Sequence, residues 1–154
     1  MLMAVFSDTH GWTEDMLRAV RIHRPDIAVH LGDFVRDALA LREEFPALDV
    51  RCVRGNCDVG SDAPEKLLFT LEGVSVFMTH GHLYYVKYTL DSLRTAAQVT
   101  GARLVLFGHT HERECRDFGA ATFLNPGSAG TGRKPSFALV ELGGGSAQCR
   151  ILDL

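Results

Sequence analysis

Five short motifs of this chain carry side chains that bind metal ions, and each motif follows an apolar, β-branched stretch. They are Asp8-Thr9-His10, Gly32-Asp33, Gly55-Asn56-Cys57-Asp58, Thr79-His80-Gly81-His82 and Gly108-His109-Thr110-His111. Each motif therefore falls where a predicted strand gives way to a loop. Because the carboxyl ends of buried strands open onto a crevice where ligands bind, we expect these side chains to gather in one site. Such a cluster is typical of two-metal centres, which mostly hydrolyse phosphate esters.

Seven side chains from these motifs are candidate metal ligands. Asp8 and His10 stand two residues apart, so at a strand end their side chains point to the same side. His109 and His111 repeat this spacing. Asp33 stands alone after its strand and is the natural carboxylate to bridge two cations. The full set of candidate ligands is Asp8, His10, Asp33, Asn56, His80, His109 and His111.

The mixture of nitrogen and oxygen ligands indicates which metals would bind. It suits two divalent transition-metal ions, with Mn²⁺ as the first choice and Ni²⁺, Co²⁺, Fe or Zn²⁺ as alternatives, and it is too nitrogen-rich for Ca²⁺ or Mg²⁺ alone. Asp8 and Asp33 cancel two of the four positive charges, so the site keeps about +2. This charge would attract a phosphate and make hydroxide from a bridging water near neutral pH. We therefore expect in-line attack on phosphorus by a metal-bridging hydroxide.

Length and composition are those of an ordinary soluble globular protein. The chain has 154 residues, of which 46% are hydrophobic and 23% charged, and a net charge of −3. This fits one domain, residues 1–154, and gives no sign of a nucleic-acid polymer or a membrane as partner. No apolar stretch approaches the roughly 18 residues of a membrane span. Without an export signal or CxxC spacing, the four cysteines are expected to be reduced thiols in a cytoplasmic protein.

The elements that would position the motifs alternate between strands and helices. Strands are predicted at 2–6, 27–31, 49–54, 67–71, 74–79, 103–107, 121–124, 136–142 and 147–153, and helices at 13–24, 35–45 and 89–100. Thr13 is expected to cap the first helix. The initial β-α-β-α-β rhythm implies parallel strands with right-handed crossovers, and Glu72-Gly73 is a plausible hairpin turn. The mixture suggests two packed sheets with helices outside.

The ordered motifs DxH, GD, GNxD, THGH and GHTH resemble those of the calcineurin-like metallophosphoesterase superfamily. The resemblance is strongest to its small single-domain phosphodiesterase branch, which shares its fold with the retromer scaffold subunit. It spans the chain from Asp8 to Asn125-Pro126-Gly127-Ser128, and five motifs in order are a specific signal. It implies a four-layer α/β/β/α sandwich with the Asn125–Ser128 turn under the metals. It also implies one metal on Asp8, His10, Asp33 and His111, and a second on Asp33, Asn56, His80 and His109.

Two positions depart from the motifs of this superfamily. Cys57 stands where many members have a histidine that assists the leaving group, and a thiol is a poor proton donor to an alkoxide. Similar small phosphodiesterases also carry GNCD, so the departure leaves the identity of the general acid open. In the superfamily's GDxxD motif the second acidic residue arrives one place late, at Asp37. We expect little consequence, because the first aspartate is the ligand.

Other polar residues lie in the motifs or close to them. His82 is either the missing acid or phosphate contact, or a neighbour that only orients a ligand. Asp58 is expected to orient a ligand or form a turn rather than to bind metal. His30, inside an apolar strand, is expected to be a core histidine with its hydrogen bonds satisfied. The candidates for a direct part in catalysis are Asp33, Asn56, His82 and Asp58.

The three tyrosines of the chain, Tyr84, Tyr85 and Tyr88, follow the fourth motif closely. They could form a wall that stacks on a nucleoside or aryl group beside the metals. They could equally pack the following helix or form a subunit contact, and packing is slightly favoured.

The leading functional prediction is a phosphodiesterase that acts on a small substrate. The site lacks an evident general acid, so diesters with acidic leaving groups should react fastest. A phosphomonoesterase is the nearest alternative. A binding scaffold that has lost the chemistry is a third, but all seven ligand positions keep metal-binding types. A nuclease for long chains lacks the basic track that polymers need. The physiological substrate, the native metal and any homo-oligomer stay open.

Overall fold

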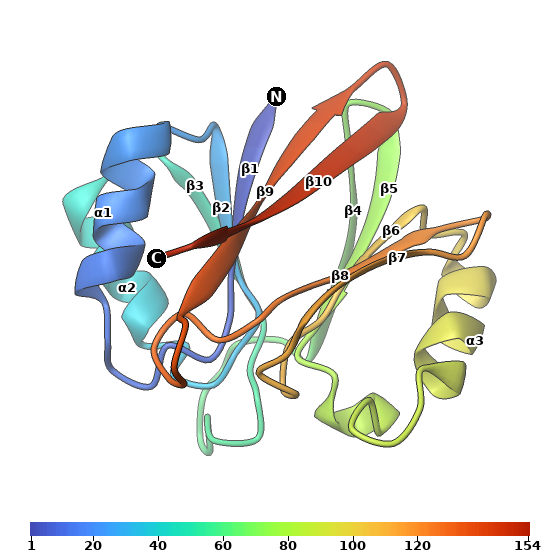
Figure 1. Cartoon of the computed structure of the whole chain (residues 1–154), viewed down its shortest axis with the longest axis horizontal. Helices are drawn as coiled ribbons and strands as arrows, with labels where there is room; N and C mark the ends of the chain where they lie inside the picture. The colour runs from blue at the N-terminus through green and yellow to red at the C-terminus, as the bar shows by residue number, and fades with distance from the viewer.

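The computed structural model describes residues 1–154. Two five-stranded sheets pack face to face, and helices cover the outer face of each sheet (Figure 1). Both sheets mix parallel and antiparallel strands. The predicted four-layer α/β/β/α sandwich is therefore confirmed.

The first sheet contains the ends of the chain, and its strand order is β10-β9-β1-β2-β3. Its strands β1, β2 and β3 are parallel, and the helices α1 and α2 connect them, as the initial rhythm predicted. The bounds are β1 Leu2–Phe6, α1 Glu14–His23, β2 Ile27–His30, α2 Asp37–Glu44, β3 Asp49–Cys52, β9 Ser136–Gly143 and β10 Ser146–Asp153.

The second sheet is formed by the middle of the chain, and its order is β4-β5-β6-β8-β7. Strands β4 and β5 form the predicted hairpin, whose turn residues Glu72 and Gly73 both have positive φ. The bounds are β4 Lys66–Leu71, β5 Val74–Thr79, the 3₁₀ turn η1 His82–Tyr84, α3 Asp91–Thr100, β6 Leu104–Leu106, β7 Arg113–Asp117 and β8 Thr122–Pro126.

Strand β1 shows how alternating side chains build two cores at once. Met3 and Val5 point into the cluster between the sheets, where they meet residues of both sheets such as Met78. Ala4 and Phe6 point the other way, into the cluster under α1 and α2. Because successive side chains of a strand face opposite sides, a strand buried on both faces must be apolar at every position. The apolar N-terminal run is therefore explained by its central place in the sheet.

Each helix packs through one apolar face. In α1 the buried side chains include Leu17 and Val20, and in α3 they include Leu93 and Ala97. Thr13 stands at the predicted N-cap, but its backbone is helical and its side chain makes no capping hydrogen bond, so that prediction is wrong. An N-cap side chain reaches the free backbone N–H groups only from an extended conformation. No helix of the chain is long and apolar enough to cross a membrane.

Strand β7 is the one strand that the sequence analysis missed. Its sequence, Arg-Glu-Cys-Arg-Asp, has no apolar alternation, and four of its five residues are charged. It lies at the edge of the second sheet and pairs with β8 alone. Charged side chains are common on edge strands because they discourage pairing with other chains. The pairing with β8 therefore makes this segment a strand, although its own sequence has only a weak preference for strand structure.

The five motifs follow β1, β2, β3, β5 and β6, so strands of both sheets deliver them to the same end of the sandwich. The neighbouring loops are joined by backbone hydrogen bonds: Asp8 N–H donates to Gly32 O at 3.0 Å, and Gly108 N–H donates to His80 O at 2.9 Å. The two sheets are joined here as well, because His109 N–H donates to Asp8 Oδ2 at 3.2 Å across 101 residues of sequence.

Candidate metal centre

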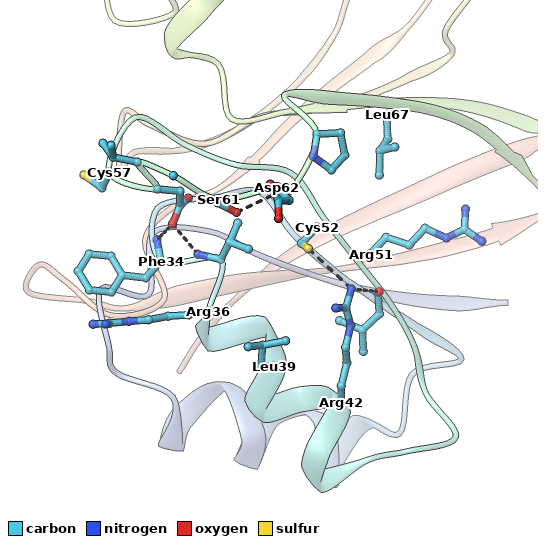
Figure 2. A pocket seen from close by; sticks show the side chains of 17 residues that line it. Phe34, Arg36, Leu39, Arg42, Arg51, Cys52, Cys57, Ser61, Asp62 and Leu67 are labelled. Carbon is cyan, nitrogen blue, oxygen red and sulfur yellow. Dashed lines mark hydrogen bonds between the residues drawn. The ribbon is translucent and has the colours of Figure 1, made fainter.

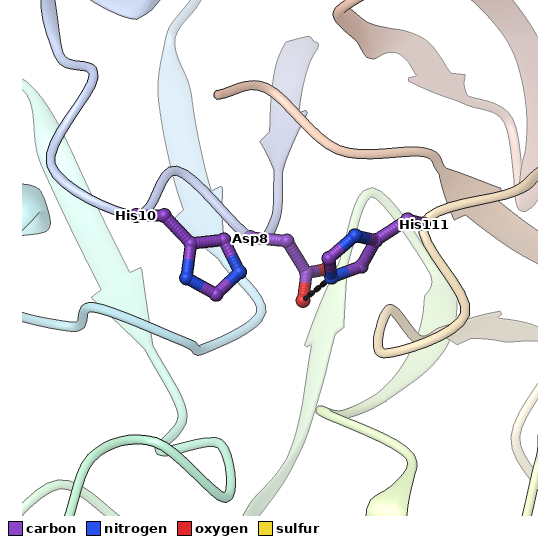
Figure 3. Close-up of side chains that lie close together, drawn as sticks. All are labelled: Asp8, His10 and His111. Carbon is purple, nitrogen blue, oxygen red and sulfur yellow. Dashed lines mark ion pairs between the residues drawn. The ribbon is translucent and has the colours of Figure 1, made fainter. Parts of the chain in front are cut away.

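A first group of ligand atoms comes from Asp8, His10 and His111, and these atoms lie within 4.8 Å of one another. The Asp8 carboxylate lies between the two imidazole rings (Figure 3). His111 Nε2 is 3.1 Å from Asp8 Oδ1, and the ring centroids of the two histidines are 5.4 Å apart. We call this set the outer group, because His111 is exposed and His10 partly so.

A second group of ligand atoms, also within 4.8 Å of one another, comes from Asp33, His80 and His109. His80 Nε2 lies 3.4 Å from Asp33 Oδ1. His80 Nδ1 lies 2.8 Å from the carbonyl oxygen of Leu31. Because a carbonyl only accepts hydrogen bonds, Nδ1 must carry the proton, and Nε2 is the nitrogen free to bind a metal. We call this set the inner group, because Asp33 and His80 are both buried.

The two groups are adjacent. His80 Nε2 of the inner group lies 3.9 Å from Asp8 Oδ1 of the outer group. Six of the seven predicted ligands are thus brought together, and they divide as the superfamily resemblance implied. Their assignment as metal ligands stays a prediction.

Several buried polar atoms of the site have no hydrogen-bond partner. They include Asp8 Oδ1, His10 Nε2 and His80 Nε2, each of which faces a carboxylate or imidazole of the groups just described. Leaving a buried acceptor unpaired costs about 1–3 kcal/mol. A divalent cation would satisfy all three atoms, and imidazole nitrogen with carboxylate oxygen is a suitable donor set. The residues present therefore fit two bound metal ions.

One imidazole in each group is drawn toward protonation by a carboxylate. In the outer group, the Asp8 carboxylate beside His111 Nε2 raises the pKa of His111. In the inner group, burial favours the neutral form of His80, but Asp33 and Asp8 outweigh burial and raise its pKa. Burial also favours protonation of Asp33, yet His80 holds the pKa of that carboxyl below its usual value. In each group, therefore, a carboxylate favours positive charge on a neighbouring imidazole.

The backbone at the ligands is unusual. Five of the candidate ligands have positive φ, which is uncommon for residues other than glycine. They are Asp8, His10, Asp33, His109 and His111. Each such conformation costs on the order of 1–3 kcal/mol and persists only where the surrounding structure imposes it. The positive φ values therefore lower the stability of the fold, and they direct these side chains toward one site.

A buried chain of hydrogen bonds holds the loop between Asp8 and His10. Thr9 Oγ1 lies 3.0 Å from His30 Nε2 and donates to Asp37 Oδ2 at 2.7 Å. Gly32 N–H donates to His30 Nδ1, so His30 Nε2 is the protonated nitrogen and donates to Thr9. His30 is thus a satisfied core histidine, as predicted.

Asp37 has a larger role than the sequence analysis gave it. Besides Thr9, its Oδ2 accepts the N–H of Gly11 at 2.7 Å, and the residue is 6% exposed. It therefore fixes the loop that carries His10. The expectation that its shifted position has little consequence stays a prediction. In the sequence, Asp37 stands in the first turn of a predicted helix, and an aspartate at such a position usually lies at the surface. Its buried position was therefore not predicted.

The turn after β8 holds residues of the outer group by hydrogen bonds. Ser128 Oγ donates to the backbone oxygen of Asp8 at 2.7 Å. Thr131 Oγ1 lies 2.8 Å from Ser128 Oγ and 3.2 Å from His111 Nδ1. Asn125 Nδ2 donates to Gly108 O at 3.0 Å. The predicted place of the Asn125–Ser128 turn under the site agrees with these contacts.

Two motif glycines are packed against the ligands. A Cβ atom on Gly55 would overlap Asp33 Oδ1, and one on Gly108 would overlap Ser7 Oγ and approach Asp8 Oδ2 to 2.9 Å. Neither glycine has positive φ, so close approach rather than backbone conformation excludes a side chain here. Ser7 itself donates to Asp8 Oδ2 at 2.5 Å, a contact that the sequence analysis missed.

The third motif ties the loop after β3 to the loop after β2. Asp58 accepts the N–H groups of Phe34, Val35 and Gly55 at 2.8–2.9 Å. It therefore orients the loop of Asp33, as expected, and a direct part for Asp58 in catalysis stays a prediction. Asn56 is exposed, and its amide points to Cys57 Sγ at 3.5 Å. Its place as a ligand stays a prediction.

His82 lies beside the inner group. Its ring centroid is 5.4 Å from that of His80 and 6.1 Å from that of His109. Burial, followed by the charge of His80, lowers the pKa of His82. Its Nδ1 is buried without a partner. His82 is therefore a neutral imidazole at the edge of the site, and its part in catalysis stays a prediction.

The three tyrosines have different surroundings. Tyr84 packs edge-on against Phe77 at a centroid distance of 5.9 Å, beside the core under α3. Tyr85 and Tyr88 are exposed. Packing against the core is thus observed for Tyr84 alone.

Comparison with known proteins gives one family. A family model described as "Calcineurin-like phosphoesterase superfamily domain" matches residues 1–145. The probable metallophosphoesterase YsnB of Bacillus subtilis is 31% identical over 159 residues, a match covering 99% of this chain and 91% of that protein.

Solved structures share the fold over the whole chain. A predicted phosphoesterase from Streptococcus pneumoniae has a TM-score of 0.84 at 30% identity, covering 99% of this chain and 88% of that one. Vps29 of Entamoeba histolytica, complexed with Zn²⁺, has a TM-score of 0.81 at 22% identity, covering 99% of each chain. An archaeal phosphodiesterase has a TM-score of 0.75 at 21% identity, covering 99% of this chain and 100% of that one.

Proposed function

Because the chain belongs to the calcineurin-like phosphoesterase superfamily, we propose that it is a two-metal phosphodiesterase for small substrates. The observation that carries the proposal is the pair of adjacent ligand groups with buried atoms that lack hydrogen bonds. The proposed ligands are Asp8, His10, Asp33, Asn56, His80, His109 and His111. Two divalent cations, with Mn²⁺ first among the candidates, would supply positive charge for the phosphate and lower the pKa of a bound water.

The residues of the chain hold the ligands in their reactive form. Asp33 is kept ionised by His80, and the N–H of Cys57 donates to its Oδ1 at 2.9 Å. The bond from His80 Nδ1 to Leu31 O turns its Nε2 toward the site. These contacts fix the ligands before substrate arrives, which is the way a fold supports electrostatic catalysis.

Two histidines of the fourth motif divide their roles in this proposal. His80 is a ligand. His82 is neutral and lies outside the groups, within 5.4 Å of His80 between ring centroids, where its N–H can steady a phosphoryl oxygen. Asp58 acts at a distance, through the loop that it ties down.

Phosphodiesters are the favoured substrates because the site offers no evident general acid for a poor leaving group. Burial and the neighbouring Asp33 raise the pKa of the Cys57 thiol to about 11. The thiol is therefore a weak acid near neutral pH. One structural neighbour is itself described as a phosphodiesterase, which supports the same choice. The cytoplasmic location and a homo-oligomer stay predictions from sequence.

The experiment is release of nitrophenol from bis(p-nitrophenyl) phosphate by metal-stripped protein, with Mn²⁺, Ni²⁺, Co²⁺, Zn²⁺ and Mg²⁺ added back in turn. We expect metal-dependent turnover that Asp33→Asn abolishes and that Asp15→Asn, a change on the exposed face of α1, leaves intact. p-Nitrophenyl phosphate is assayed in parallel.

A higher kcat/KM on the monoester would replace the proposal with a phosphomonoesterase. Silence with every metal, from protein that calorimetry shows to bind two ions, would replace it with a binding scaffold.

A further inference from the structure

A groove with a volume of about 960 Å³ lies beside the metal centre, between α2 and the loop of residues 57–64 (Figure 2). Its lining mixes aliphatic side chains, among them Val35, Leu39 and Val59, with the side chains of three arginines. This volume is within the usual range of small-molecule sites, roughly 300–1,000 Å³. The groove is therefore large enough for an organic substituent of a phosphate ester.

Two residues border both the groove and the metal centre. Phe34 directly follows the ligand Asp33, and its ring centroid lies 5.1 Å from that of His10. Cys57 also lines the groove, and its N–H donates to Asp33 Oδ1. A phosphate held at the metal centre would therefore send one of its substituents between Phe34 and Cys57 into the groove.

Two of the three arginines have no carboxylate partner. Arg36 is exposed, and its guanidinium carbon lies 4.8 Å from the centroid of the Phe34 ring, at the end of the groove nearest the metal centre. Arg42 donates to the carbonyl of Val50 at 3.0 Å and forms no ion pair. The third, Arg51, is paired with Asp49.

The carboxylates of the groove leave this positive charge largely unopposed. Asp58 already accepts three backbone N–H groups, so its charge is engaged within its own loops. Asp62 is the only other carboxylate of the lining, and it is exposed to solvent. A guanidinium is a planar fork of donors that matches phosphate and carboxylate geometry. Arg36 is therefore placed to bind an anionic group that enters the groove beside Phe34.

We propose that the groove binds the substituent of the phosphodiester that does not leave, and that this substituent carries a second phosphate or carboxylate held by Arg36. The inference deepens the proposed function and rests on it for the position of the scissile phosphate. The aliphatic side chains of Val35, Leu39 and Val59 would cover apolar parts of the same substituent.

The test compares two substrates that differ only in the second anion. They are the p-nitrophenyl ester of thymidine 5′-phosphate and the same ester with an added 3′-phosphate. We expect a higher kcat/KM for the substrate with the 3′-phosphate, and Arg36→Ala should lower the ratio of the two values about tenfold. Arg103→Ala removes an exposed arginine outside the groove and should keep the ratio.

A binding measurement separates this inference from the proposed function. Thymidine 3′,5′-bisphosphate and thymidine 5′-phosphate are titrated by calorimetry, with and without Mn²⁺. If no diester is hydrolysed but the bisphosphate binds more tightly and loses that advantage in Arg36→Ala, the groove assignment stands and the proposed function fails. If turnover is seen and Arg36→Ala behaves like Arg103→Ala, the groove assignment is overturned.

Discussion

The outer and inner ligand groups of the metal centre differ in burial and in what holds them. In the outer group the His111 side chain is 41% exposed, whereas in the inner group the His80 side chain is fully buried. Polar side chains of other segments, such as Asp37 and Thr131, hold the outer group. Backbone groups, the carbonyl of Leu31 and the N–H of Cys57, hold the inner one.

This difference shows two ways of fixing a ligand. A ligand buried against the sheets is held by packing and by backbone atoms that no substitution removes. A ligand at the rim depends on side chains that a single substitution can delete. The inner group should therefore be the more rigid one, and the outer group the one that loop contacts control.

The largest contrast is expected from removing one histidine of each group. His80→Ala should lower kcat/KM on bis(p-nitrophenyl) phosphate about a thousandfold, a loss of about 4 kcal/mol, because it removes a fully buried imidazole whose Nε2 faces both carboxylates of the site. His111→Ala should cost about tenfold to a hundredfold, because water can enter at the exposed rim.

Calorimetry should count one bound ion fewer in His80→Ala. His23→Ala, which removes a histidine in the last turn of α1 and outside the five motifs, is the control. Equal losses in the two variants would show that burial does not distinguish the groups.

A second contrast concerns pH and the support of the outer group. Burial lowers the pKa of His30 to about 4, below its unfolded value near 6.5. The unfolded chain therefore binds more protons in this window. The free energy of unfolding is therefore not reduced by His30 above about pH 6.5. As the pH falls from 6.5 toward 4, protonation of His30 in the unfolded chain lowers the free energy of unfolding by about 3 kcal/mol in all.

Urea unfolding of metal-free protein at pH 7, 6 and 5 measures this effect. His30→Gln keeps a donor for Thr9 but does not titrate, so its stability should fall less steeply with acid than that of the unaltered chain. The raised pKa values of His80 and His111 act in the opposite direction, but they are common to both proteins. Parallel pH profiles would contradict the buried neutral histidine.

A third contrast uses the two glycines packed on the ligands. Gly55→Ala should disturb Asp33 and the inner group, and Gly108→Ala should disturb Asp8 and the outer group. Overpacking of this kind costs about 2 kcal/mol. Thermal unfolding and metal titration should show lower stability in both variants and the loss of a different ion in each.

Gly143→Ala is the matched control, because nothing lies within 4 Å of a Cβ at that position and its φ is not positive. Normal binding of both ions by the two variants would mean that the loops can shift without moving the carboxylates.

The smallest effect is expected from the hydrogen bonds behind Thr9. Asp37→Ala removes the acceptor for Thr9 and Gly11, and it should weaken the ion of the outer group about tenfold while the inner ion binds as before. Asp37→Asn keeps an acceptor oxygen and should restore most of the affinity. Co²⁺ titration followed by its visible spectrum measures both ions. Equal weakening of the two would mean that Asp37 supports the fold and not one group.

The sequence was a good guide to the fold where local pattern and burial agree. Strand β1 is buried on both faces and is apolar throughout. Helix α1 is buried on one face and has apolar residues at helical spacing. Both elements were predicted. The charged strand β7 was missed because its partner β8, not its own composition, makes it a strand. Thr13 failed as a cap because its backbone is helical, which composition does not reveal.

The sequence by itself determined which side chains gather at one end of the sandwich, because strands end where apolar runs end and parallel strands place their carboxyl ends together. The spacing of the motifs did not show the division into two groups, which the superfamily resemblance implied; the tertiary structure produces it, since Asp8 meets His111 from the other sheet. The tertiary structure alone placed Asp37 behind Thr9, and Arg36 beside the groove. Contacts between residues far apart in sequence depend on how the two sheets pack, and such packing leaves no periodic pattern in the chain.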